Sequence, residues 1–175
     1  MPRQIVLLRG VNLGARNRVA MARLREALEA AGYEDVKTLL QSGNVVMGGP
    51  KTTPAKIEGL LRETFGLDIA VVVRTRAELA AVVAGNPLAD VADNPKRLQV
   101  SFLSGKPTAA VVRALEEAEI APEVVAVRGR EIYAWHADGI QRSPLAKLLG
   151  DDKLGVTATA RNWNTVTKLL ALADA

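Results

Sequence analysis

The stretch VKTLLQSGNVVMG, residues 36–48, decides the fold. Two runs of strand-forming residues, 36–41 and 44–48, flank Ser42-Gly43, a pair typical of a tight hairpin turn. One helix precedes this hairpin and another follows it, and an apolar strand lies beyond each helix. The expected elements of the first half are a strand over 3–9, a helix over 20–31, the hairpin, a helix over 54–65 that Thr53 caps, a strand over 69–74, and a last helix from the capping box Thr75-x-x-Glu78 to about Gly85.

The second half repeats this order of elements. Its expected elements are strand 97–103, helix 107–118, strands 124–127 and 131–135, a helix from Ser143-Pro144 to Leu149, strand 155–159, and a final helix that Thr159 caps and that runs to about Ala173. Strand–helix–strand–strand–helix–strand is the split βαβ order. The sequence therefore predicts an α+β protein of two tandem ferredoxin-like subdomains, each followed by an extra helix. We expect them at 1–85 and 97–175, joined by a linker at 86–96 that is rich in proline and asparagine.

The two halves differ in the connection after the first strand. In the second half it is Ser104-Gly105-Lys106, whereas in the first half it is the long, basic loop 10–19. Long loops in compact domains are often functional. In a split βαβ unit the first two strands run parallel with the third between them, so this loop and the turn 41–44 should lie roughly 10 Å apart at one sheet edge. A single concave site could use both segments.

Three motifs, LRGVNLGARNRVAM, TLLQSGNVV and TARNWNTVTKL, resemble the 1697 family of domains of unknown function. The resemblance spans nearly the whole chain. It implies a bacterial protein without an established activity and a fold of two ferredoxin-like subdomains. The sequence departs from the family pattern at Ala15, where a glycine is usual, at Ala20, where a proline is usual, and at Met47, where an aromatic residue is common.

Charge is distributed unevenly along the 175 residues, whose formal net charge is +4. Residues 1–25 hold six arginines and no acid, and residues 36–57 also lack acids. This pattern suits an anionic partner. The chain has no cysteine, so it has neither disulfides nor thiolate metal ligands, which fits a cytoplasmic protein. We predict no membrane span, no metal site and no cofactor, and the sequence leaves the oligomeric state open.

The candidate ligand-binding residues are basic or amide-bearing and fall in three segments. Guanidinium groups bind phosphate and carboxylate in a bidentate manner, glycines allow close backbone approach, and a helix start near Ala20 would add free N–H groups. Alternatively, Asn12 and Asn17 could hold the loop backbone by hydrogen bonds, and the residues of the turn 41–44 could serve only to form the turn. The candidates are Arg9, Gly10, Asn12, Asn17 and Arg18 in the loop, Gln41, Ser42 and Asn44 at the turn, and Arg161, Asn162 and Asn164 in the first turn of the last helix.

The leading hypothesis is a protein that binds an anion, either a nucleotide-like molecule or a nucleic-acid backbone. The strands 3–9 and 44–48 carry no aromatic residue, which argues against RNA recognition by base stacking. One alternative is an enzyme on a small phosphorylated or carboxylated substrate, with arginines as an electrostatic clamp but without an obvious general base. Another is a scaffold without a ligand. His136, the one histidine, is expected at the surface or on a strand edge.

Overall fold

Each half of the chain forms a four-stranded antiparallel sheet with helices, as the sequence predicts. The computed structural model describes residues 2–175, apart from the side chain of Asp151. Contacts divide the chain into two compact units, one running to Ala81 and including Lys168–Ala175, the other Val82–Thr167. That the halves 1–85 and 97–175 would fold as separate domains stays a prediction.

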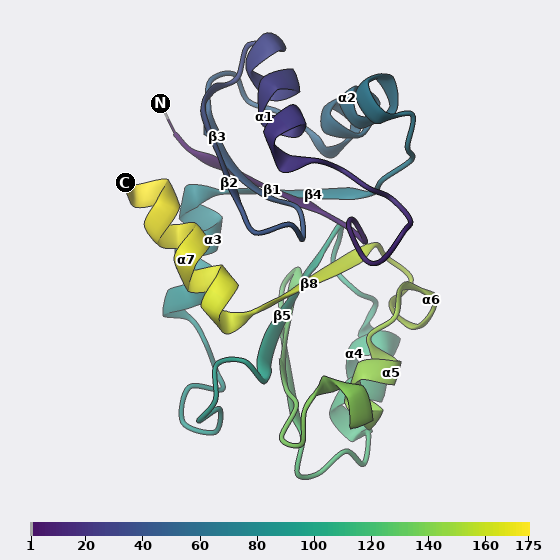
Figure 1. The fold of residues 1–175 in the computed structure, drawn as a ribbon. Coiled ribbons are helices and arrows are strands. Elements are labelled where there is room, and N and C mark those ends of the chain that lie inside the picture. Colours follow the sequence, from purple (N-terminus) through teal and green to yellow (C-terminus); the bar gives the residue numbers. More distant parts are fainter. Residues whose placement is uncertain (1) are drawn as a thin grey trace. The chain divides into compact units, whose positions relative to one another are not determined.

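The first unit has the strand order β2-β3-β1-β4, so β3 lies between β2 and β1 as predicted. Figure 1 shows α1 and α2 on the same face of this sheet. Apolar residues at helical spacing, such as Leu24, Leu28, Ile57 and Leu61, pack there against Val6 and the strand residues that share its face. The elements are β1 Gln4–Leu8, α1 Met21–Ala30, β2 Glu34–Leu39, β3 Asn44–Gly48, α2 Pro54–Phe65, β4 Val71–Thr75 and α3 Arg76–Ala84.

Local signals fixed the helix starts in this unit. The Thr53 hydroxyl accepts a hydrogen bond from Lys56 N–H at 3.3 Å and caps α2. The predicted capping box is also formed, because Thr75 N–H donates to Glu78 Oε1 at 2.9 Å and Glu78 N–H donates to Thr75 Oγ1 at 3.0 Å.

The second unit has the strand order β6-β7-β5-β8, the same topology as the first. Its smaller core gathers around Leu103, Leu115, Ile132 and Leu154. The elements are β5 Leu98–Leu103, α4 Ala109–Glu117, β6 Val124–Arg128, β7 Glu131–Trp135, a 3-10 turn Ile140–Arg142, α5 Pro144–Leu148, α6 Asp151–Leu154, β8 Ala158–Asn162 and the start of α7 Trp163–Asp174, whose residues from Lys168 on belong to the first unit. No helix among residues 2–175 is both apolar enough and long enough to cross a membrane.

The expected hairpin turn and the expected last strand were wrong. The hairpin turn is four residues long, because the last strand pair is Leu39 with Asn44, and Leu40 takes a φ of +60°. The last strand is also displaced toward the C-terminus: it runs over Ala158–Asn162 and not over 155–159, since it pairs with β5 from Leu103 to Gln99. Asn162, and not Thr159, therefore caps α7, accepting a hydrogen bond from Thr165 N–H at 3.0 Å.

Candidate functional site

The basic loop and the hairpin turn meet at one edge of the first sheet. The Asn12 amide nitrogen donates to the Gln41 carbonyl at 2.6 Å, and Leu8 N–H at the end of β1 donates to the Gly43 carbonyl at 2.9 Å. The edge geometry predicted from the strand order therefore brings these two segments into contact.

Both loop asparagines hold the backbone of the loop. Asn12 has a φ of +57°, its amide also donates to the Val19 carbonyl at 2.8 Å, and its carbonyl oxygen accepts from Val19 N–H at 2.9 Å. Asn17, with a φ of +50°, donates to the Gly10 carbonyl at 3.3 Å. Asparagine tolerates this left-handed region better than most residues. The two side chains thus give the loop a defined shape.

Apolar anchors fix the loop at its base and leave its tip exposed. Val11 and Val19 are buried, while Leu13 is 74% exposed. Leu13 pairs with Arg16 in an isolated antiparallel bridge, which makes the tip a small turn of its own. Arg9, Arg16 and Arg18 are all exposed.

The turn residues divide into structural and accessible ones. Asn44 is fully buried, and its amide donates to the Leu39 carbonyl at 2.8 Å and to Ser42 Oγ at 2.9 Å, which closes the turn. Gly43 has a φ of +88° and lies against Leu8 and the loop base. Gln41, in contrast, is exposed.

A cavity of about 300 Å³ lies where the loop, the turn and α1 meet. Its walls are Asn12, Arg18, Val19, Ala20 and Gln41. Ala20 is the N-cap of α1 and supplies no side-chain cap, and the first turn of α1 holds no acid. The first N–H groups and the positive end of the helix dipole are therefore available on this side. Arg18 and Arg16 form no ion pair with any described residue.

The third predicted segment lies in the second unit and is organised differently from the expectation. Arg161 is on β8, not in the first turn of α7, and is 8% exposed. It donates to Thr159 Oγ1 at 2.7 Å and to the Ala160 carbonyl at 2.9 Å, and burial lowers its pKa to about 10. Asn162 caps the helix, so the presence of one of the two asparagines is explained without a ligand. Asn164 is half-buried in the first turn of α7.

His136 was predicted wrongly, because it is 1% exposed and not at the surface. Its Nδ1 lies 2.7 Å from Ser143 Oγ and 3.2 Å from Glu123 Oε2, and Ser143 Oγ donates to the same carboxylate. Leu145 N–H donates to the other carboxylate oxygen at 3.0 Å. Strand alternation was the signal for this, since it puts His136 on the same face as the buried Ile132 and Ala134.

Electrostatics in this cluster favour an ionised glutamate and a neutral histidine. Burial raises the pKa of Glu123, but hydrogen bonds from Ser143, Leu145 N–H and His136 outweigh it, so the pKa lies below its ordinary value. Burial lowers the pKa of His136, and the hydrogen bond and charge of Glu123 offset this only in part. In the described part of the chain no three His, Asp or Glu side chains converge in a way that could hold a metal ion.

Comparison with known proteins gives a family and a fold. Residues 1–133 match the model of a family described as "protein of unknown function (DUF1697)". The chain is similar in structure to the conserved bacterial protein SP0830 from Streptococcus pneumoniae, with a TM-score of 0.74, 22% sequence identity and 98% of each chain covered. No curated protein matches the sequence.

Proposed function

Since the chain belongs to the DUF1697 family, whose function is unknown, we propose that it binds a small phosphate- or carboxylate-bearing molecule in the cavity between the loop, the turn and α1. One observation carries the proposal. Asn12, Arg18 and Gln41, which were singled out from two separate segments of the sequence, line the same cavity as the uncapped start of α1.

The charges around this cavity favour an anion. Arg18 contributes a guanidinium group that forms no ion pair with a described residue, and residues 1–25 contain no carboxylate that could neutralise it locally. The N-terminus of a helix of 10 residues adds N–H donors aimed at the same space. A guanidinium group and backbone N–H groups are both donors, so together they complement the oxygens of phosphate or carboxylate.

The remaining predicted residues of the first unit would shape this site. Asn12 and Asn17 hold the loop, and Gly43 and Asn44 hold the turn, so the donors of Arg18 and Gln41 are carried on backbone that is already ordered. Preorganised donors lose less conformational entropy when a ligand binds. Arg9, exposed directly after β1, would add positive potential at the same sheet edge.

The concave shape favours a small molecule over a nucleic-acid backbone, which would need a longer basic track. The five residues that line the cavity include no acid and no histidine, so they offer no general base. We therefore propose binding and not catalysis. The lack of cysteine suits action in the reducing cytoplasm.

The experiment measures the melting temperature of the full chain with inorganic phosphate, pyrophosphate, citrate and ADP. A ligand at 100 times its Kd should stabilise the protein by about 2.7 kcal/mol. Arg18→Gln should raise the Kd of the stabilising ligand at least tenfold. Arg16→Gln is the matched control, because it changes an exposed loop arginine outside the cavity wall, and it should leave the Kd unchanged.

Two results would overturn the proposal. One is the absence of stabilisation by all four anions, and the other is equal stabilisation of wild type and Arg18→Gln. Binding of a duplex or single-stranded oligonucleotide, with an affinity that falls steeply with salt, would assign the loop to nucleic acid instead.

A further inference from the structure

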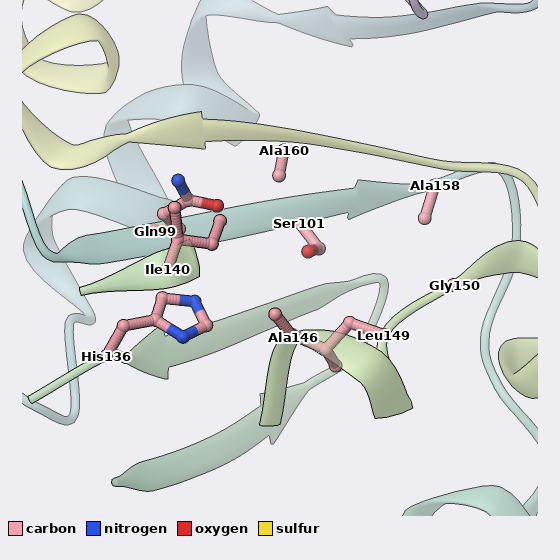
Figure 2. A pocket seen from close by; sticks show the side chains of 9 residues that line it. All are labelled: Gln99, Ser101, His136, Ile140, Ala146, Leu149, Gly150, Ala158 and Ala160. Carbon is pink, nitrogen blue, oxygen red and sulfur yellow. The ribbon is translucent and has the colours of Figure 1, made fainter. Parts of the chain in front are cut away.

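The second unit contains a cavity that the basic loop does not explain. It has a volume of about 170 Å³ and lies against one face of the second sheet, beside α5 (Figure 2). Three polar side chains, Gln99, Ser101 and His136, line it together with small residues that include Ala146 and Ala160. All of them belong to the same unit.

The internal repeat explains why there is space here. The two sheets share one topology, and in both the first strand pairs with the last one. In the first sheet Val6 lies opposite Val73, and in the second Ser101 lies opposite Ala160. The neighbouring pairs fix this correspondence: Leu8 with Val71 in the first sheet, and Leu103 with Ala158 in the second. At three of these four positions the second unit has a smaller side chain, so the sheet face that is filled in the first unit is partly empty in the second.

The hydrogen bonds of the buried cluster fix the proton on His136. Ser143 Oγ has a single proton, which it donates to Glu123 Oε2, and it also accepts from Ala146 N–H at 2.9 Å. His136 Nδ1 faces this hydroxyl oxygen and the carboxylate, so it must be the donor to them. The neutral imidazole is then protonated on Nδ1, and Nε2 presents a lone pair.

This lone pair is directed at the cavity. Figure 2 shows the His136 ring at the cavity wall with one nitrogen on the side of Gln99. Among the described residues, Nε2 of His136 and the side chains of Gln99 and Ser101 make no hydrogen bond to protein, yet no fully buried side-chain N or O atom lacks a partner. These polar atoms are therefore accessible from the cavity.

We propose that this cavity binds a small uncharged molecule that donates an N–H or O–H group to His136 Nε2. The Gln99 amide and the Ser101 hydroxyl would then pair with a second polar group of the ligand, and the alanine walls would cover its apolar part. An anion is disfavoured, because the unprotonated nitrogen and the carboxylate of Glu123 behind it both repel negative charge. The volume limits the ligand to roughly six non-hydrogen atoms, since a water molecule occupies about 30 Å³ of liquid.

The test uses pyrazole as the probe and the imidazole nitrogen signals of the intact, ¹⁵N-labelled protein at pH 8. His136 is the single histidine, so its signals need no assignment. Without probe, the Nδ1-protonated tautomer is expected. Pyrazole should shift the Nε2 signal in a saturable manner, and 1-methylpyrazole, which has the same ring but no N–H donor, should bind at least tenfold more weakly.

Variants connect the shift to the cavity. Ser101→Val places there the residue that the first unit has at the corresponding position and should abolish the pyrazole shift, while Ser101→Ala keeps the space and should weaken binding by no more than about tenfold. Ala160→Val fills the cavity from a different strand and should have the same effect as Ser101→Val.

Several outcomes would overturn the proposal: an Nε2-protonated tautomer, no saturable shift with pyrazole, equal binding of 1-methylpyrazole, or a shift that persists in both filled variants. A shift caused by inorganic phosphate in place of pyrazole would also contradict it. None of these outcomes bears on the loop cavity, since that site contains no histidine.

Discussion

Replacing Gly43 with alanine should destabilise the first unit more than an ordinary glycine substitution in a turn. Gly43 has a φ of +88°, which costs a residue with a Cβ roughly 1–2 kcal/mol. The new Cβ would also lie 2.7 Å from Leu8 Cβ and 2.8 Å from Val11 Cγ2. Neither atom is the far end of a flexible side chain, so backbone must move, and overpacking of this kind costs about 1–3 kcal/mol.

The expected total is a loss of about 2–5 kcal/mol in the free energy of unfolding, from the sum of these two terms. For a chain of this size that corresponds to a fall in Tm of roughly 4–20 °C. Gly14→Ala is the matched control, because Gly14 has a φ of +80° but nothing within 4 Å of the position a Cβ would take. It should cost only the backbone term of roughly 1–2 kcal/mol.

Urea unfolding followed by far-UV circular dichroism measures both variants against wild type. The comparison isolates steric contact, since both substitutions place alanine at nearly the same φ. If Gly43→Ala is no less stable than Gly14→Ala, the turn does not pack against the loop base as described. The reasoning that these segments form one site would then fail as well.

Two further changes test the loop and the second unit. Asn12→Ala should cost roughly 1.5–4.5 kcal/mol by urea unfolding, since it removes three hydrogen bonds to Val19 and Gln41; an unchanged stability would mean that the loop holds its shape without them. The pKa of Tyr133 is raised to about 12 by burial and by the charge of Glu131, so the folded state keeps the proton that the unfolded state loses near pH 10. The contribution of this group to the free energy of unfolding should be fully present below pH 10 and fall by ~2–3 kcal/mol between pH 10 and 12. Tyr133→Phe also loses the 2.7 Å hydrogen bond to the Val82 carbonyl, and it should remove this part of the alkaline decline. An identical decline in the variant would contradict the assignment.

The parts of the fold that depend on local sequence could be predicted. Helix starts were accurate at Thr53, Thr75 and Ser143, where a side-chain cap or a proline marks them. The helix expected from Pro107 begins instead at Ala109, with Thr108 as its cap. The sheet order followed from the sequence of elements, because the split βαβ topology leaves few alternatives. The loop and turn could be placed at one edge for the same reason.

The errors arose where contacts distant in sequence decide the structure. Thr159 and Asn162 are both good caps, and pairing with β5 settled the choice in favour of Asn162. His136 appeared isolated because its partners, Glu123 and Ser143, lie 13 residues before it and 7 residues after it. The sequence did show a polar residue on the buried face of a strand, but its burial could be explained only once its hydrogen-bond partners were known.

Because the two units share one topology, side chains and connections at corresponding places can be compared directly. At three corresponding positions on the sheet face beside His136, the first unit has valine and the second has serine or alanine, so the space there is a property of side chains and not of the backbone. Conversely, the long basic connection after β1 has a short counterpart after β5, so the loop cavity arises from an inserted segment. One site offers a guanidinium group and helix N–H donors, and the other offers an unprotonated imidazole nitrogen. Because a donor-rich cavity selects anions and an acceptor selects donors, the two sites should bind ligands of different charge, and a molecule that fits one should not fit the other.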